Sequence, residues 1–459
     1  MESPTRATRN SGEGFSQGRS KYGRRKAVAF ALVFLAAFGV RLLCWQDARS
    51  EAAGVQTAVT DNYKHLARLL RQNGASSFFD PSSTTSDPDL LGHPPGYPIV
   101  LAFLYKGFGE QDAAAQIFQI VCDSLAAALV LLIASELLPF GVGVIAGTLV
   151  ALAPQFCWNC VLLLPDTLAV LPVLLAVLLI LRARARHAFI KALAAGVLVG
   201  VSCWLRANAL LLAPFLLLLV PLLFARGRKL RPALALVGGA LVAVAPLTVR
   251  NAVVFGHFIP VSLGAGQTFV EGLADYDPGR RFGLPDTDIE LMRQEALIYG
   301  KSEYSGALFT PDGFERDRAR TSRGLAVISS HPLWFASVMA RRAASMLRLE
   351  RTPLTSTLPV SEGWTRVPRF ALRVVQKMFI TAIVLPLVLF GAGLLARERN
   401  WRALAALLAV PLYYLCVQSA LHTEYRYVLG VQYFLLVLAA ASLYHGGLFT
   451  RRKWSERGR

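Results

Sequence analysis

The chain has 459 residues, of which 54% are hydrophobic and 17% charged, and its formal net charge is +19. A soluble domain carries about 25% charged residues, so this composition excludes an ordinary soluble globular protein. The positive charge alone could indicate nucleic-acid binding, but about half of the basic residues flank apolar segments, where membrane topology accounts for them. We therefore predict a membrane protein without a nucleic-acid partner.

The apolar residues gather in blocks close to the ~20 residues that a helix needs to cross a bilayer. These blocks predict an all-α polytopic membrane protein with about ten transmembrane helices. In chain order the predicted spans are residues 27–45, 112–137, 140–156, 161–181, 189–204, 208–225, 232–248, 374–396, 401–420 and 427–448.

The basic residues set the predicted orientation. Arg and Lys are frequent before the first span, after the fourth, sixth and eighth spans, and in the C-terminal tail. With about ten spans, all of these segments fall on one side, which the positive-inside rule assigns to the cytoplasm. The first block is longer than a cleavable signal core and lacks a small-residue cleavage site. We therefore expect a plasma (bacterial inner) membrane protein with both termini in the cytoplasm.

The predicted organisation follows from this map. It consists of a disordered basic cytoplasmic tail, an N-terminal transmembrane bundle, a large exterior region, C-terminal transmembrane helices and a basic cytoplasmic tail, at residues 1–26, 27–248, 249–373, 374–448 and 449–459. The bundle includes a first exterior loop at 46–111. Residues 333–348 mix apolar and basic faces, which indicates an amphipathic helix in the outer interface. Cys157 and Cys160, in FCWNC, are either a disulfide in an oxidising compartment or two small buried residues.

Polar residues gather on the predicted exterior side. Asp61 and His65 follow the first span at helical spacing, so they share one helix face. His93 opens the HPPGYP turn within the first predicted exterior loop. Further charged or polar residues lie near the outer ends of later spans: Asp166, Arg206, Arg250, Asn251, Glu424 and Arg426. Ionisable groups at membrane depth are costly and are functional candidates by default. Each also has a structural alternative, such as helix capping by Asp166 or snorkelling by Arg206 and Arg250.

The order of short motifs resembles the GT-C superfamily of membrane glycosyltransferases, close to the dolichyl-phosphate-mannose protein O-mannosyltransferase and lipid A aminoarabinose transferase branch. The matching stretches are TDNYKHLA, HPPGYPIVLAFLYKGFG, PDTLA, GVLVGVSCWLRANALLLAPF, APLTVRNAVVFGHFIPVSLGAGQTFVEG and EYRYVLGVQYF. The resemblance implies a helical bundle with exterior juxtamembrane helices. It also implies a polyprenyl-phosphate-linked sugar donor and transfer with inversion at the anomeric carbon.

By this resemblance, Asp61 is the catalytic acidic residue of the first exterior loop and Asp166 the second acidic position. Arg250 and Arg426 are candidates for the donor phosphate, with His65, His93 and Lys64 as lesser ones, because cations stabilise a leaving phosphate. We further predict substrate contacts by Tyr63, Tyr97, Asn251, Glu424 and Tyr427. Asp61 and Asp166 could share Mg²⁺ or Mn²⁺, which oxygen ligands favour. Asn62, however, stands where many relatives carry a second acid.

Within this reading, Asp61 acts as the general base on an acceptor that is a lipid, a glycan or a protein. Membrane lipids would surround the spans and the polyprenyl tail. Three alternatives stay open: a secondary transporter, a non-catalytic lipid-binding or scaffold membrane protein, and a polymerase or ligase of surface polysaccharide. A transporter would place its polar residues near the bilayer midplane, whereas here they gather at the exterior face.

Overall fold

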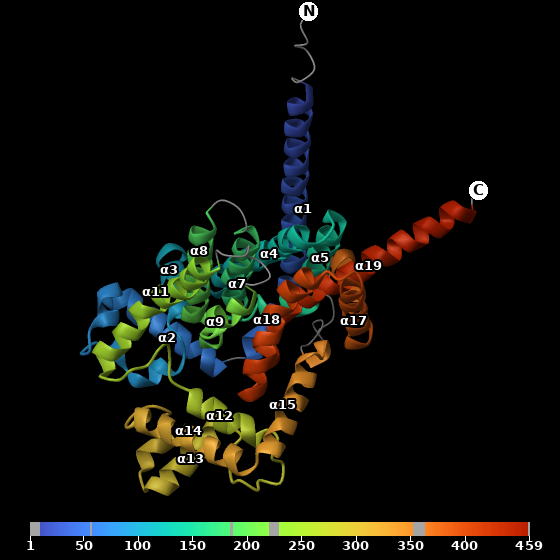
Figure 1. Ribbon diagram of the computed structural model, residues 1–459. Coiled ribbons are helices and arrows are strands. Elements are labelled where there is room, and N and C mark those ends of the chain that lie inside the picture. The colour runs from blue at the N-terminus through green and yellow to red at the C-terminus, as the bar shows by residue number, and fades with distance from the viewer. Residues whose placement is uncertain (1–9, 56, 184–186, 220–228, 352–362, 458–459) are drawn as a thin grey trace, which may run out of the picture.

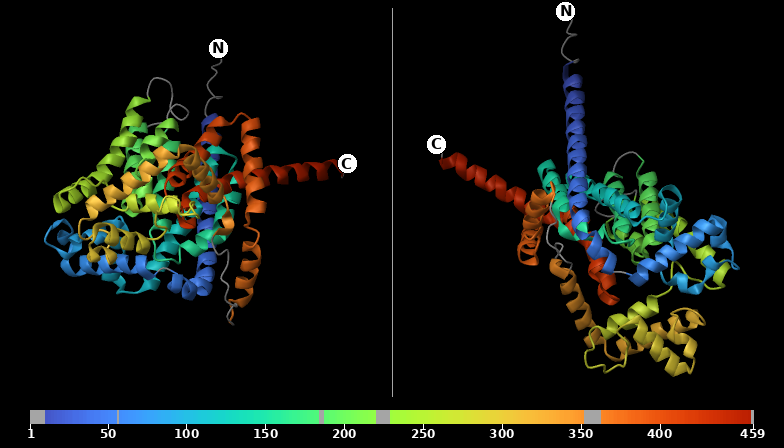
Figure 2. Two further views of the ribbon diagram at one scale, coloured as in Figure 1. Left: turned by 90° about the horizontal axis from the view of Figure 1, so that it is seen from below. Right: turned by 180° about the vertical axis from the view of Figure 1, so that it is seen from behind.

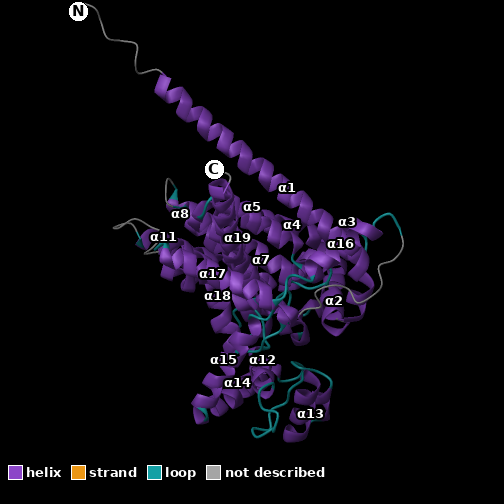
Figure 3. Cartoon of the chain, turned by 90° about the vertical axis from the view of Figure 1, so that its right-hand side faces the viewer, coloured by secondary structure: helices purple, strands orange, loops and turns teal. Residues whose placement is uncertain are grey.

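The computed structural model describes residues 10–55, 57–183, 187–219, 229–351 and 363–457. Within these ranges the chain forms helices and connecting turns and no strand (Figure 3). Six of the described helices are long and apolar enough to cross a membrane, and they lie in α1 (Asn10–Val55), α4 (Asp112–Leu137), α8 (Ala188–Leu205), α11 (Leu230–Phe255), α18 (Trp401–Ala420) and α19 (Leu429–Arg457). The predicted all-α polytopic membrane fold is confirmed.

The other predicted spans coincide with apolar helices that are shorter or broken: α5 (Phe140–Leu152), α7 (Asp166–Arg182), α9 (Leu212–Leu216) and α17 (Thr381–Arg397). Proline sets two of these limits. Pro154 begins the short helix α6 (Pro154–Asn159) directly after α5, and Pro165 precedes α7. A proline has no N–H to continue a helix but fits its first turn, so it restarts the helix in a new direction.

A close helix crossing in the bundle joins α8 and α11 through small residues. A Cβ atom on Gly196 of α8 would lie 2.0 Å from the carbonyl oxygen of Leu236, and one on Gly239 of α11 would lie 2.3 Å from that of Leu193. Small residues at such spacing let two helix backbones approach within a membrane. This crossing fixes α8, which ends at the candidate site.

A buried ion pair ties the first span to the rest of the bundle. Arg41 of α1 pairs with Asp123 of α4, which also accepts a hydrogen bond from Tyr433 of α19. Arg41 Nη1 donates to the carbonyl of Ala151 at 3.2 Å. Each charged group therefore has partners, as a buried charge requires.

The predicted exterior region contains α12 (Ala265–Ala274), α13 (Asp288–Tyr299), α14 (Gly313–Ser330) and α15 (Pro332–Met346). Helices α12 to α14 lie on the opposite side of the bundle from the start of α1 and the end of α19 (Figures 1 and 2). We refer to α12–α14 and their connections as the exterior module. The stretch predicted to be an amphipathic helix, 333–348, falls mainly on α15, whose buried Arg342 donates to the carbonyl of Ser419 at 2.9 Å.

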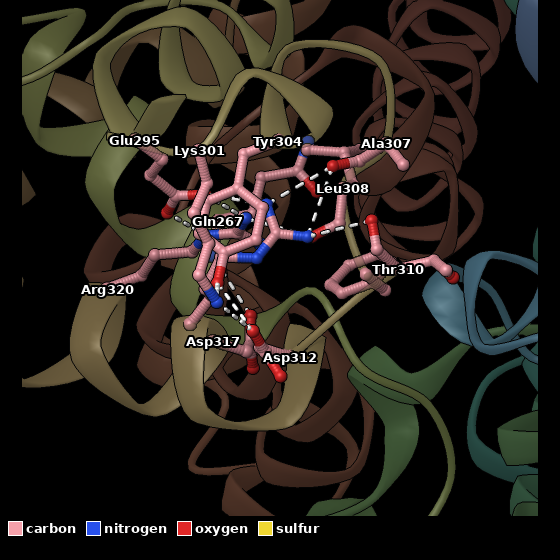
Figure 4. Close-up of polar contacts among 12 residues, drawn as sticks. Gln267, Glu295, Lys301, Tyr304, Ala307, Leu308, Thr310, Asp312, Asp317 and Arg320 are labelled. Carbon is pink, nitrogen blue, oxygen red and sulfur yellow. Dashed lines mark hydrogen bonds and ion pairs between the residues drawn. The ribbon is translucent and has the colours of Figure 1, made fainter. Parts of the chain in front are cut away.

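The interior of the exterior module is held by a buried ionic cluster (Figure 4). Glu295 of α13 accepts from Arg320 Nε at 2.7 Å and from Arg316 Nη1 at 3.0 Å, both from α14. The same arginines donate to carbonyls of the connection between α13 and α14, at Leu308 (2.9 Å) and Ala307 (3.2 Å). One carboxylate therefore joins two helices and orders the connection between them.

Helix α16 (Arg366–Gln376) is polar on its buried side and apolar on its exposed side. Arg369 is 3% exposed and pairs with Asp47 of α1 at 2.6 Å, whereas Val367 and Phe370 are 75% and 63% exposed. The helix meets α17 at an angle of 60°. Such a helix suits a site where its outward side faces lipid.

The two cysteines of FCWNC are buried and free. Cys160 Sγ lies 3.1 Å from the carbonyl oxygen of Cys157, and Gln376 Nε2 lies 3.5 Å from Cys157 Sγ. Of the two alternatives given for Cys157 and Cys160, the structure shows two small buried residues without a disulfide.

Candidate active site

The first part of the site is an ion pair between the start of α7 and the end of α8. These neighbouring helices run antiparallel, so Asp166 and Arg206 lie at the same end of the bundle. Both Nε and Nη2 of Arg206 donate to Asp166 Oδ1, Nε at 2.8 Å. Asp166 Oδ2 is buried and has no hydrogen-bond partner among the described residues. The pair therefore retains one acceptor oxygen that the surrounding side chains do not satisfy.

The second part comes from the turn between α18 and α19. Arg426 Nη2 donates to Glu424 Oε1 at 2.9 Å, and the Tyr427 hydroxyl donates to the same oxygen at 3.3 Å. The guanidinium of Arg206 lies 4.4 Å from the centroid of the Tyr427 ring, and that of Arg426 lies 5.3 Å from it. Cation–π contact on one ring thus brings together two arginines that are 220 positions apart in the sequence (426 − 206).

The third part comes from the predicted first exterior loop, through α2 (Thr57–Asn73) and α3 (Gly96–Phe108). The buried Tyr63 ring packs on His93 and Tyr97, with centroid distances of 5.3 and 5.2 Å. The Tyr97 hydroxyl donates to Gln119 Oε1 at 2.7 Å, which anchors α3 to α4. Two aromatic rings therefore hold the predicted HPPGYP turn beside α2.

Gly96 explains how that turn reaches the ion pair. A Cβ atom at Gly96 would lie 2.4 Å from the carbonyl oxygen of Trp204, two residues before Arg206. Burial and the positive charges of Arg206 and Arg426 lower the pKa of His93 to about 4. The imidazole is therefore neutral at ordinary pH and can offer a hydrogen bond but no charge.

The structure divides the predicted site residues into groups. Tyr63, Tyr97, His93, Asp166, Glu424, Arg426 and Tyr427 surround or adjoin the site just described. Asp61 and His65 are exposed on α2, on one face as expected, and Asp61 forms no hydrogen bond or ion pair within the described ranges. Its catalytic role stays a prediction. Lys64 pairs with Asp112 at 2.7 Å, which braces α2 against the start of α4.

Arg250 and Asn251 lie in another environment. Arg250 Nε donates to the carbonyl of Phe78 at 2.9 Å, and Nη2 donates to that of Thr85 at 3.2 Å. Asn251 Nδ2 donates to the carbonyls of Ile259 and Val261, each at 3.0 Å. These side chains hold backbone in place, so the phosphate role of Arg250 and the substrate contact of Asn251 stay predictions.

Arg206 is the residue that the predicted site lacked. The sequence places it among the ionisable candidates near the span ends, with snorkelling to headgroups as the structural alternative, and assigns it no role in the site. The signal that could have found it is topological, because Asp166 lies near the start of one predicted span and Arg206 directly follows the next. Consecutive antiparallel helices bring those two positions to the same end of the bundle.

At Asp166, the Arg206 guanidinium occupies Oδ1 through two of its nitrogens, so a divalent metal ion could approach this carboxylate only through Oδ2. Across the described part of the chain, no group of three or more His, Cys, Asp or Glu side chains is arranged to hold a metal ion. We derive no step through a metal, and Mg²⁺ or Mn²⁺ stays a prediction.

Comparison with known proteins supports the expected family. Residues 92–249 match the family model described as dolichyl-phosphate-mannose-protein mannosyltransferase. This stretch includes His93, Asp166 and Arg206. No curated protein sequence matches the chain.

Solved structures match a larger part of the chain. The archaeal oligosaccharyltransferase AglB from Archaeoglobus fulgidus, in complex with an inhibitory peptide and a dolichol-phosphate, is similar over 94% of this chain, with a TM-score of 0.50 and 16% identity. The same enzyme in its apo form matches with a TM-score of 0.51 and 14% identity. The chain has the GT-C fold. The resemblance expected from the motifs is confirmed.

The GT-C fold here is carried by a shorter chain, which spans about half the length of the archaeal enzyme, 52% in both comparisons. ArnT from Cupriavidus metallidurans, bound to undecaprenyl phosphate, is similar over 91% of this chain and 77% of its own, with 16% identity and a TM-score of 0.38. That score does not by itself establish a common fold.

Proposed function

We propose that the chain is a membrane glycosyltransferase that moves a sugar from a polyprenyl-phosphate donor to an acceptor on the exterior side, with inversion. The observation that supports this most is the pair of guanidiniums, Arg206 at the end of α8 and Arg426 in the turn between α18 and α19, on the ring of Tyr427. Two arginine side chains at the end of a membrane-spanning bundle are suited to bind the phosphate of a lipid-linked sugar. The two archaeal structures described above share this fold, and one of them holds a dolichol-phosphate.

The arginines are suited to the phosphate of the donor and of the leaving group. Their carboxylate bonds use Nε and Nη2, and within the described residues Nη1 of each guanidinium has no hydrogen bond. A phosphate that accepts from both Nη1 atoms would be held by charge-assisted bonds. As the sugar leaves, charge builds on the phosphate oxygen, and both cations stabilise it.

The acceptor hydroxyl needs a base on the opposite side of the sugar from the leaving phosphate. Asp61 fits that role in our proposal because its carboxylate is exposed, is not paired within the described residues, and shares α2 with Tyr63, which packs in the site. Asp166 has the different role of orienting Arg206. Membrane lipid surrounds the polyprenyl tail, and both termini of the chain lie in the cytoplasm.

The test is transfer by the full chain in lipid nanodiscs with a polyprenyl-phosphate sugar. Asp61→Asn should lower turnover by about 10²–10⁴-fold, the usual contribution of a general base, and leave donor binding intact. Asp286→Asn, an exposed aspartate in the exterior module, is the matched control. Near-normal turnover of Asp61→Asn would remove the base assignment.

A second outcome would reject the function as a whole. If the wild-type chain binds the donor but releases no polyprenyl phosphate with any lipid, glycan or peptide acceptor, it is a lipid-binding scaffold. Transfer of a preassembled glycan chain in place of a single sugar would identify the polymerase or ligase alternative.

A further inference from the structure

A cavity of about 420 Å³ lies beside α2, away from the arginine pair. Its walls are formed by His65 and Leu69 of α2 and by a turn of the first exterior loop, and the lining residues are His65, Leu69, Ser82, Ser83, Thr84, Ser86 and Asp87. Every lining residue except Leu69 is polar. Its volume is within the range of small-molecule sites, about 300–1,000 Å³.

The hydroxyl-bearing wall is fixed by bonds from behind. Ser82 Oγ donates to Asp80 Oδ1 at 2.7 Å, and Ser86 Oγ donates to the Asp80 carbonyl at 2.6 Å. The buried Arg250 donates to the carbonyls of Phe78, which precedes this turn, and of Thr85, which lies within it. Arg250 therefore shapes the cavity wall, although it does not line the cavity.

The exterior module holds the far end of the same wall. Thr310 Oγ1 donates to Asp87 Oδ1 at 3.3 Å, and the backbone N–H of Phe309 donates to Asp89 Oδ1 at 2.7 Å. The Glu295 cluster orders the segment that contains Thr310 and Phe309, because its arginines bind the neighbouring carbonyls (Figure 4). Two regions far apart in sequence thus build one preformed wall.

The wall offers alternating hydrogen-bond donors and acceptors to a ligand. Thr84 Oγ1 accepts from Asn73 Nδ2 at 3.2 Å, which leaves its proton to donate, and Ser83 Oγ likewise accepts from Thr85. Asp87 Oδ2 has no hydrogen-bond donor within the described residues. Donors and acceptors on one wall suit the neighbouring hydroxyls of a sugar ring, and Leu69 can contact its C–H face.

The cavity also lies along the face of α2 that carries Asp61. Asp61, His65 and Leu69 follow one another at four-residue intervals, so each is about one helical turn, ~6 Å, from the next. Asp61 is therefore one helical turn from His65, the nearest residue that lines the cavity, and so it lies close to a sugar ring bound there.

We propose that this cavity is the acceptor subsite and that it takes a hydroxylated sugar ring, so the enzyme acts on a glycan. This rests on the glycosyltransferase function proposed above. In the step, Asp61 takes the proton of an acceptor hydroxyl, and that oxygen forms the new bond to the anomeric carbon. The bond from that carbon to the phosphate oxygen breaks, and polyprenyl phosphate leaves with the electron pair.

The experiment uses the full chain in nanodiscs, methyl glycosides of common hexoses as acceptor probes, and a Ser/Thr-containing tripeptide as the rival probe. Thr84→Val and Asp87→Asn should each raise the KM for the glycoside at least tenfold. The KM for the donor and the rate of donor hydrolysis by water should not change. The matched controls are Thr148→Val and Asp286→Asn, the same two changes at exposed positions outside the cavity.

Saturation-transfer NMR of the glycoside provides a readout that does not depend on turnover. Its signal should be strong with wild type and Asp61→Asn, and lost with Thr84→Val. Unchanged glycoside KM and NMR signal in both cavity variants would overturn the subsite, as would transfer to the tripeptide that these variants do not affect. Failure of wild type to release polyprenyl phosphate even to water would instead overturn the proposed function, since donor hydrolysis does not require the cavity.

Discussion

Asp166 and Arg206 depend on each other, because the carboxylate is 5% exposed and the guanidinium supplies its only hydrogen bonds within the described chain. Arg206→Met should destabilise the protein by about 3–5 kcal/mol, since it leaves a buried carboxylate without its counter-ion. The double variant Asp166→Asn/Arg206→Met should recover most of that loss. Thermal unfolding in nanodiscs measures both effects, and equal melting temperatures for the single and double variants would contradict the coupling.

His93 gives the site a pH response. Its pKa falls to about 4 in the folded chain, whereas it is about 6.5 in the unfolded chain. Between these values the unfolded chain binds a proton that the folded chain does not, so stability should fall as pH is lowered from about 6.5 to 4. His93→Gln should flatten this part of the stability curve. Unfolding midpoints across that pH window, compared with exposed His187→Gln as control, provide the check.

At the scale of single residues, the sequence predicted which side chains share one face of a helix. It did not predict contacts between residues that are far apart in the chain and adjacent in the fold. The shared face of Asp61 and His65 follows from helical spacing alone. The bonds of Arg250 to Phe78 and Thr85 span more than 160 residues, since they run from 250 to 78 and 85, and no local pattern encodes them. Charge at a span end indicated importance, but it could not distinguish a ligand-binding arginine from one that holds backbone.

Among the elements, α3 approaches the end of α8 only because Gly96 has no side chain. Gly96→Ala would place a Cβ 2.4 Å from the Trp204 carbonyl oxygen, so α3 must move and His93 with it. We expect lower stability and at least a tenfold loss of transfer. Gly107→Ala in the same helix meets nothing within 4 Å and should be neutral or slightly stabilising, because alanine favours helix by up to about 1 kcal/mol. Equal behaviour of the two variants would contradict the close approach.

The predicted helices were found largely where apolar blocks indicated them, because bilayer thickness sets a length that hydropathy alone can detect. Their limits were less accurate where proline intervened. The block at 140–156 is divided by Pro154, and the block at 374–396 divides into α16 and α17. A hydropathy average does not register a change of helix direction, so broken helices appear continuous in the sequence.

For the whole molecule, the predicted topology places the exterior module and the turn between α17 and α18 on opposite sides of the membrane. In a chain whose native cysteines are replaced by alanine, Ser302→Cys should react with a membrane-impermeant maleimide in intact cells. Glu398→Cys should react only after the cells are opened. Both positions are exposed, so a difference in labelling by the maleimide reports the side of the membrane on which each residue lies. Labelling of Glu398→Cys in intact cells would reverse the orientation.

Composition and span order sufficed to predict the class of the whole molecule, and the motifs its GT-C fold. They did not predict how the exterior module meets the first exterior loop. That contact depends on single hydrogen bonds, such as the one from Phe309 N–H to Asp89, and on the shape of a connection ordered by a buried carboxylate. Neither has a periodic signature.

Helix α16 has a consequence for the protein outside its membrane. Its outward side displays Val367 and Phe370, and Trp364, in the turn before the helix, is 92% exposed. The polar side of the helix pairs with Asp47 of α1. Exposure of these apolar side chains to water is unfavourable. Contact with lipid acyl chains removes this cost, and the low dielectric constant there strengthens the ion pairs with Asp47. Lipid therefore covers the apolar side of α16 as a neighbouring helix would in a soluble protein. Removal of the lipid by a harsh detergent should detach α16 from α1 before the helical bundle unfolds.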